Sequence, residues 1–196
     1  MIRTKKELVE YLKKDSRNYQ GDTNILRRIL SALNSSPISD QTYIWKYIKA
    51  MRLCEYAQSH QKSIFGKIRK IYYSHLLLRY AYKTGFQIAP GTIGKGLAIW
   101  HWGMIIIHQD VRIGENCVLQ PNVVIGKRKK QGMPPRIGNN AYICSGARIL
   151  GDITIGDNVT IAPNTVVFKN VPSNCVVAGN PAIIIKKNGM KVHIPL

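Results

Sequence analysis

Aliphatic residues recur at a fixed interval of six through the second half of the chain. A six-residue period matches neither the 3.6-residue period of an α-helix nor the two-residue alternation of a single strand. It matches a parallel β-helix, in which each six-residue segment forms one short strand and one corner. Gln131 alone interrupts the series, whose members are Ile107, Ile113, Leu119, Ile125, Ile137, Ile143, Ile149, Ile155, Ile161 and Val167. We therefore expect these side chains to form the core of a coil.

The positions between the aliphatic residues fit the same coil. Turn-forming triplets follow three of them, at 114–116, 138–140 and 156–158, and each triplet begins with glycine and ends with asparagine. Such residues favour tight corners. The fifth position of each six-residue segment is small or branched, as a narrow stacked core requires: Cys117, Val123, Ala141, Ala147, Val159 and Thr165.

Residues before Phe86 have helical periodicity instead. Thr4 and Glu7 form a capping-box pattern that starts a short helix running to about Lys14. We expect a second helix from Asp22 or Thr23 to Leu33, broken at 34–37, and a third opening at Ser39 or Asp40. The third helix repeats apolar residues at helical spacing: Ile44, Tyr47, Ile48, Met51 and Cys54. The chain is thus predicted to be mainly β, with a β-helix preceded by an α-helical region.

A fourth helix is expected over 62–83, with Gly85 as its C-terminal stop. Its apolar residues lie on or near one face: Ile64, Ile68, Ile71, Leu78 and Tyr82. Basic residues decorate it: Lys62, Lys67, Arg69, Lys70, Arg79 and Lys83. Such a helix either docks on the next domain with a solvated basic face or makes peripheral contact with an acidic membrane.

Three departures from the repeat mark special segments. Ile93 and Ile99 keep an early six-residue phase, which slips by two before Ile107. The basic, proline-containing segment 127–136 is expected to form a loop at one corner. Asn188-Gly189 predicts a hairpin with a type I′ turn. We expect a helical region at 1–85, a β-helix domain at 86–182 and a C-terminal tail at 183–196.

The composition bears on the ligands, the thiol state and the location of the protein. The net charge of +19 attracts anions such as phosphorylated cofactors, but no nucleic-acid-binding module is visible. Four cysteines without a CxxC pair indicate reduced thiols. No secretory signal and no apolar run of the ~20 residues that span a bilayer is present. We therefore expect a cytoplasmic protein. The alternative is a cytoplasmic protein that makes peripheral contact with a membrane through residues 62–83.

Residues 86–187 resemble a serine-acetyltransferase-like member of the hexapeptide acyltransferase superfamily. The helical residues 61–85 also resemble those preceding the β-helix in relatives that O-acetylate surface polysaccharides. The resemblance implies a left-handed coil, a departure from the right-handed crossover rule. The motifs that carry it are GLAIWHWGMIII (96–107), IGENC (113–117), IGNNAYICSGARILGDITIGDN (137–158) and AGNPA (178–182).

The resemblance implies acetyl transfer with His101 as the catalytic residue. A positioned imidazole removes the proton of an acceptor hydroxyl as it attacks a thioester. We expect direct transfer, without an acyl-enzyme, a metal ion or a metal cofactor. The resemblance implies acetyl-CoA as the cosubstrate, bound along the outside of the coil between two subunits of an expected homotrimer. The residues that match its binding positions are Ser145, Ala162, Pro163, Lys186 and Lys187.

The acceptor is expected to be a sugar hydroxyl in capsule, exopolysaccharide or lipopolysaccharide assembly. In true serine acetyltransferases a carboxylate that orients the base aligns with Gln87, and an aspartate just before the catalytic histidine aligns with Trp100. The arginine-histidine pair that helps hold the amino acid aligns near Met133-Pro134. Gln87 is a candidate for orienting His101, whereas Trp100 and Trp102 suit stacking on a sugar ring. His108 is a further acceptor-binding candidate.

Other functions remain open on the sequence. The runner-up is O-acetylation of serine or another small hydroxyl-bearing metabolite, followed by N-acetylation of an amino sugar. A catalytically inactive scaffold is a further alternative. A metal-dependent enzyme of the γ-carbonic-anhydrase kind would need three converging histidines. A nucleic-acid-binding protein would explain only the charge.

Overall fold

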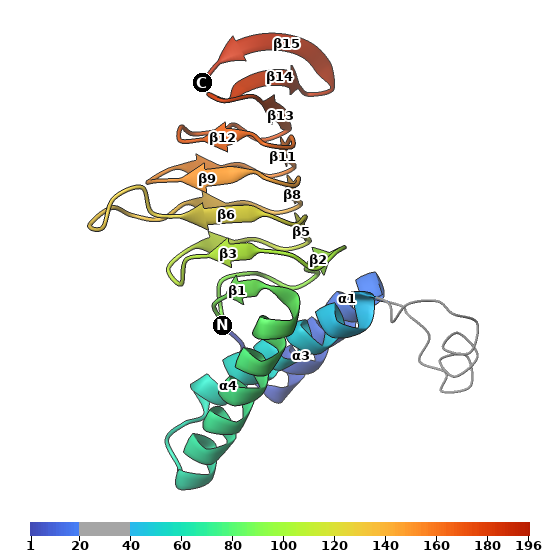
Figure 1. Ribbon diagram of the computed structural model, residues 1–196, viewed down its shortest axis with the longest axis vertical. Helices are drawn as coiled ribbons and strands as arrows, with labels where there is room; N and C mark the ends of the chain where they lie inside the picture. Colours follow the sequence, from blue (N-terminus) through green and yellow to red (C-terminus); the bar gives the residue numbers. More distant parts are fainter. Residues whose placement is uncertain (20–39) are drawn as a thin grey trace, which may run out of the picture.

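The structure, a computed structural model, describes residues 1–19 and 40–196. In these parts the chain forms three α-helices and then a column of short strands that rises away from them (Figure 1). The helices are α1 (Lys5–Ser16), followed by a 3-10 turn (Arg17–Tyr19), α3 (Asp40–Ser59) and α4 (Ile64–Thr84). The helix expected between Asp22 or Thr23 and Leu33, with its break at 34–37 and the Ser39 start, lies outside the described residues.

The strands stack into three parallel sheets that form the sides of the coil. One sheet has the order β1-β3-β6-β9-β12, a second β10-β7-β4, and a third contains β13-β11-β8-β5-β2. Their bounds are β1 Phe86–Ile88, β2 Ala98–Ile99, β3 Ile105–Ile107, β4 Arg112–Ile113, β5 Val118–Leu119, β6 Val123–Gly126, β7 Arg136–Ile137, β8 Tyr142–Ile143, β9 Arg148–Leu150, β10 Thr154–Ile155, β11 Thr160–Ile161, β12 Val166–Val167 and β13 Cys175–Ala178. The predicted parallel β-helix preceded by helices is therefore confirmed.

The six-residue series occupies one strand per member. Its ten aliphatic residues lie one each in β3 through β12, and every one is at most 5% exposed. The small residues at the fifth positions, such as Cys117 and Ala141, are buried beside them. Three strands make one turn of the coil, so most series members stack on the member eighteen residues away, as Ile143 does on Ile161. Across the loop after Gly126 the spacing is twenty-four residues, as for Leu119 and Ile143. The period predicted the core correctly because most corners consume the same number of residues.

A ladder of asparagines builds one corner. Asn116, Asn140, Asn158 and Asn174 all have φ between 56° and 58°. This left-handed conformation is one that asparagine tolerates better than most residues. Their amides are joined by three hydrogen bonds of 2.8–2.9 Å from Nδ2 to the next Oδ1. The expected turn triplets therefore stabilise the coil as well as permit its corners.

Two corners are longer than the rest. Ile99 and Ile107 are eight residues apart, and the two extra residues lie in the corner between β2 and β3. The basic segment after Gly126 leaves the coil as a loop between β6 and β7 (the yellow loop of Figure 1). Both departures from the repeat are thus accommodated at corners, where an insertion does not disturb the stacked strands.

The helices join the coil through a buried charge network. Arg52 of α3 is fully buried and binds Asp15 at 2.8 Å, with Glu55 at 3.5 Å. It also donates to the carbonyl oxygens of Ile93 and Gly94 at 2.7 Å. Asp15 in turn accepts the Leu97 N–H at 3.0 Å. This network ties α1 and α3 to the first turn of the coil.

The expected cap of α1 and buried face of α3 are confirmed, but α4 differs from expectation. Thr4 and Glu7 form the capping box, and Ile44, Ile48 and Met51 are buried. On α4, by contrast, the apolar residues expected on one face are 50–83% exposed: Ile64, Ile68, Ile71, Leu78 and Tyr82. The helix packs through its opposite side, where Leu77, Tyr80 and Ala81 contact the core.

The chain continues past the coil as an antiparallel hairpin of β14 (Ile183–Lys187) and β15 (Met190–Pro195). Asn188 and Gly189 both have positive φ, as a type I′ turn requires. The hairpin extends the third sheet to seven strands because β14 pairs with β13. Among the described residues, no helix is long and apolar enough to cross a membrane.

Candidate active site

His101 lies in the enlarged corner between β2 and β3, and its side chain is exposed. The neighbouring indoles of Trp100 and Trp102 are 43% and 48% exposed. Both ends of the corner are held by helices. The Gln41 amide of α3 donates to the Trp100 carbonyl at 2.7 Å, and Gly103 N–H donates to the last residue of α4, Thr84, at 2.9 Å. The helical region therefore positions the expected base.

The register of the coil brings His101 and two of the expected acetyl-CoA residues to the same corner. Ile99 pairs with Leu119, Leu119 with Ile143, and Ile143 with Ile161. The residues two positions beyond these are His101, Pro121, Ser145 and Pro163, which we call the His101 corner. Parallel strands lie about 4.8 Å apart, so Ser145 is two steps, or roughly 10 Å, along the corner from His101.

The remaining acetyl-CoA candidates continue along the same sheet. Ala162 precedes Pro163 at the end of β11, and its N–H donates to the Val177 carbonyl at 2.9 Å. Lys186 and Lys187 are exposed on β14. Lys186 pairs with Val176, which continues the row of Tyr142 and Thr160. An extended anionic ligand could follow this row from the His101 corner to the two lysines.

Two polar side chains beside this corner were not singled out from the sequence. Gln120 Oε1 accepts hydrogen bonds from the backbone N–H and the hydroxyl of Ser145, at 3.0 and 3.2 Å. Gln120 Nε2 donates to the Tyr142 hydroxyl at 3.1 Å, and the Tyr142 ring packs edge-on against Trp100 with centroids 5.6 Å apart. Sequence pattern could not reveal these contacts because the partners are 22 to 42 residues apart.

Gln87 and His108 are placed on the sheet that begins at β1. Gln87 is exposed on β1, opposite Ile106 of β3. His108 follows the end of β3, whereas His101 precedes its start. The two histidines therefore occupy successive corners, and one chain alone does not bring them together. The acceptor-binding role of His108 and the orienting role of Gln87 stay predictions.

The corner of His108 gathers charged groups of both signs. Asp110 lies 3.7 Å from His108 Nδ1 and 3.1 Å from Lys127 Nζ. Arg128, the next residue of the loop, stacks over Phe168 at 5.5 Å. The part of the loop that adjoins the coil is therefore attached to it, and a carboxylate, an imidazole and an ammonium lie close together there.

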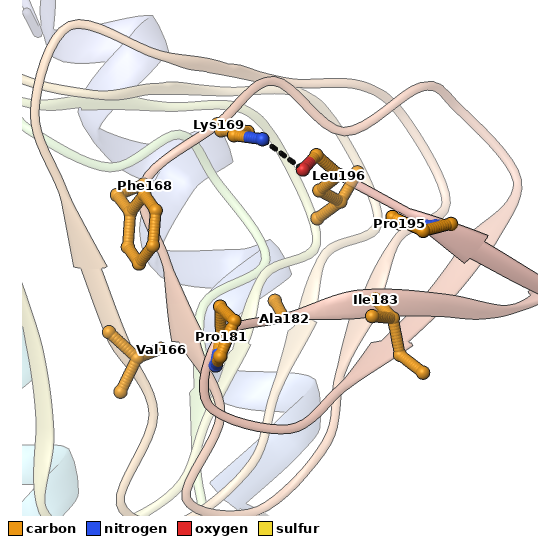
Figure 2. Close-up of a pocket in the computed structure, with 8 residues that line it drawn as sticks. All are labelled: Val166, Phe168, Lys169, Pro181, Ala182, Ile183, Pro195 and Leu196. Atoms are coloured by element: carbon orange, nitrogen blue, oxygen red, sulfur yellow. Dashed lines mark hydrogen bonds between the residues drawn. The ribbon is translucent and has the colours of Figure 1, made fainter.

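A cavity of about 170 Å³ lies between the last turn of the coil and the C-terminal hairpin (Figure 2). Phe168, Pro181 and Ala182 provide an apolar lining. Lys169 contributes a positive charge and donates a hydrogen bond to the Leu196 carbonyl (Figure 2). Pro181 and Ala182 belong to the AGNPA segment, which begins at the end of β13. Lys169 was also missed from the sequence.

Cys144 precedes Ser145 and is the thiol adjacent to the site. Burial raises the pKa of the Cys144 thiol above its usual value, so the thiol stays protonated at neutral pH. A protonated thiol is a poor nucleophile. Within the described ranges, no group of three or more His, Cys, Asp and Glu side chains is arranged to hold a metal ion.

Comparison with known proteins matches the repeat and finds similar enzymes. Residues 134–169 match the family model described as bacterial transferase hexapeptide (six repeats). A serine acetyltransferase of Synechococcus elongatus is 37% identical over 112 residues, which are 56% of this chain and 46% of that protein. One from Staphylococcus xylosus is 40% identical over 112 residues, 56% of this chain and 52% of that protein. The chain thus spans about half the length of these relatives.

Solved structures share the fold over nearly the whole chain. The serine acetyltransferase of Neisseria gonorrhoeae aligns with a TM-score of 0.66 at 24% identity, over 95% of this chain and 67% of that one. The N-terminal helices are therefore included in the structural likeness, although the sequence matches extend over little more than half of the chain.

These relatives overturn the expectation of a sugar acceptor. The curated relatives named here are serine acetyltransferases. The sugar interpretation rested on the uncharged residues Gln87, Trp100 and Met133-Pro134 and on two exposed indoles. Trp100 packs against Tyr142, so its ring has a partner within the chain. The repeat match, the relatives and the shared fold support a likeness to the serine acetyltransferase-like proteins of the hexapeptide-repeat acyltransferase superfamily.

Proposed function

We propose that this protein is an acetyl-CoA-dependent O-acetyltransferase whose acceptor is serine or a similarly small hydroxyl-bearing metabolite. The observation that carries the proposal is the His101 corner, where the coil aligns an exposed imidazole with Ser145 and Pro163. The names of the relatives support the acceptor. A serine acetyltransferase solved in complex with CoA shares the fold, with a TM-score of 0.66 at 21% identity, and supports the cosubstrate.

The reaction proceeds by direct transfer. His101 removes the proton of the acceptor hydroxyl while the hydroxyl oxygen forms a bond to the thioester carbonyl carbon. The negative charge that develops on the carbonyl oxygen is stabilised by a backbone amide, for which Ser145 N–H is the candidate. The C–S bond then breaks, and the CoA thiolate takes the proton back from the imidazolium. The protonated state of the adjacent Cys144 supports a path without an acyl-cysteine.

An amino-acid acceptor also needs partners for its carboxylate and ammonium groups. The corner of His108 has both kinds, since Lys127 and Arg128 are basic and Asp110 is acidic. Because this corner and the His101 corner lie at opposite ends of β3, a complete site requires two chains. We therefore propose a homotrimer in which the His108 corner of one subunit faces His101 of the next. Light scattering at micromolar concentration should give three times the chain mass of 22.1 kDa, and a monomer would contradict the site.

The domain division and the hand of the coil belong to the same proposal. Residues 86–182 form the catalytic β-helix, wound left-handed as in the superfamily, and 1–85 hold the His101 corner in place. The tail, 183–196, supplies Lys186 and Lys187 for the phosphate end of CoA. The exposure of both ammonium groups on the extended sheet supports that role.

Peripheral membrane contact through α4 stays a prediction. Its support is the exposed apolar face, flanked by five basic side chains on a helix without an acidic one. Vesicles of phosphatidylcholine with phosphatidylglycerol should carry the protein upward in a flotation gradient, whereas phosphatidylcholine alone should not. Protein that remains at the bottom with both would contradict the contact.

The decisive experiment measures CoA release from acetyl-CoA with serine, other small hydroxyl compounds and amino sugars. We expect turnover with serine or a close analogue. His101→Ala should lower kcat at least about 100-fold, the usual effect of losing a general base. His193→Ala, an exposed histidine on β15, is the matched control and should retain the wild-type rate. Near-normal turnover by His101→Ala would remove this imidazole from the mechanism.

A further inference from the structure

Gln120 uses every polar group of its side chain at the His101 corner. Its Oε1 accepts from Ser145 N–H at 3.0 Å and from Ser145 Oγ at 3.2 Å, and its Nε2 donates to Tyr142 at 3.1 Å. The orientation of the amide is settled by chemistry, since a backbone N–H can only donate and its partner must be the oxygen. Gln120 is partly exposed, so its outer side reaches solvent.

The Ser145 N–H differs from its neighbours in the partner that it has. Cys144 N–H donates to the Ile161 carbonyl, and Gly146 N–H donates to the Pro121 carbonyl. Those acceptors belong to the backbone of adjacent turns and cannot leave without unwinding the coil. The equivalent positions, Pro121 and Pro163, have no N–H. Ser145 therefore presents an amide whose acceptor is a side chain, and a side chain can move by changing its rotamer.

Gln120 Oε1 is a carbonyl oxygen, as is the acyl oxygen of a thioester. Both are acceptors on an sp² carbon and need an in-plane donor about 3 Å away. The oxygen of Gln120 therefore occupies the position that an acyl oxygen would take if it bound Ser145 N–H. The two oxygens compete for one donor.

We propose that Gln120 is a gate on the acyl subsite that must give up the Ser145 N–H when acetyl-CoA binds. This inference rests on the proposed function. Free CoA has no acyl oxygen, so it binds without displacing Gln120. The gate thus weakens the binding of acetyl-CoA relative to the binding of CoA. The contact between Gln120 and Tyr142 also links the position of the gate to Trp100, the neighbour of His101.

The test compares the affinities of acetyl-CoA and CoA by calorimetry, without any acceptor. Gln120→Ala removes the competitor and should raise the ratio of acetyl-CoA affinity to CoA affinity about threefold, the value of one neutral hydrogen bond. Gln120→Glu supplies a charged acceptor that binds N–H more strongly, and should lower the ratio roughly tenfold. Tyr142→Phe removes the contact of Gln120 Nε2 that helps hold the gate, and should raise the ratio by less than Gln120→Ala does.

The affinity ratio is expected to change in opposite directions in Gln120→Ala and Gln120→Glu, and this distinguishes a gate from a structural role. A residue that only supports the coil would weaken both ligands together in both variants, and that result would overturn the proposal. Unchanged ratios in a wild-type protein that binds both ligands would overturn the gate and leave the acetyltransferase proposal intact. A wild-type protein that binds neither ligand would overturn both.

Discussion

The coil and the helical region bury their apolar residues by different rules. In the coil, each member of the six-residue series is buried wherever it occurs, because every turn stacks on an equivalent turn. In the helical region, Ile48 of α3 is fully buried while Ile68 of α4 is 58% exposed, although both lie on apolar helical faces. A repeat supplies its own neighbours, whereas a helix depends on what the rest of the chain places beside it.

The polar groups differ in the same way. The coil satisfies its corners with short local ladders, such as the hydrogen bond of 2.8 Å from Asn140 to Asn158. The helices reach the coil through a buried charged cluster, in which Arg52 and Asp15 are both 0% exposed. Loss of one rung affects one corner, but loss of the cluster would affect the whole junction. The junction matters for the proposed function because the helices hold the His101 corner.

The largest expected loss of stability is therefore at this junction. Arg52→Met leaves the Asp15 and Glu55 carboxylates buried without their guanidinium, which should lower the free energy of unfolding by about 3–5 kcal/mol. Urea denaturation followed by circular dichroism measures it. Lys49→Met, at an exposed position of the same helix, is the control and should change stability by less than about 0.5 kcal/mol. Equal losses of unfolding free energy in both variants would show that the cluster contributes no more to stability than an exposed side chain of the same helix.

A matched pair of isoleucines compares the two regions directly. Ile143→Ala opens a cavity in the coil and should cost about 2–5 kcal/mol of unfolding free energy. Ile68→Ala removes a side chain that is exposed in the chain, and should cost less than about 0.5 kcal/mol. A larger loss for Ile68→Ala would show that this face of α4 is covered by another molecule in solution.

Two glycines of the coil test how closely adjacent turns pack at the corners. A Cβ on Gly156 would lie 2.5 Å from the Ser173 backbone nitrogen, so Gly156→Ala must displace an adjacent turn. We expect a loss of about 1–3 kcal/mol, typical of overpacking. Gly126→Ala is the control, because its Cβ would make an ordinary contact of 3.6 Å with His108. Thermal denaturation of both variants should rank Gly156→Ala as the less stable, and the reverse order would contradict the corner geometry.

Some residues of the candidate site could be predicted from the sequence, and others could not. His101 was predicted because it follows Ile99 at a slip in the repeat, within a motif resembling known enzymes. Ser145 and Pro163 followed from the same resemblance. Gln120, Tyr142 and Lys169 lie at ordinary repeat positions, and only the stacking of distant turns reveals their contacts. The acceptor was predicted wrongly because single aligned positions outweighed the similarity of the whole domain.

The sequence by itself determined the coil, its core residues, its looped corner and the start of α1. These features depend on interactions between residues close in sequence or at a constant separation, so a period is enough to predict them. Only the tertiary structure decided which face α4 buries, how Arg52 ties the helices to the coil and which side chain holds Ser145 N–H. Those contacts join residues 25 to 42 positions apart without any period, and only the folded chain brings them together.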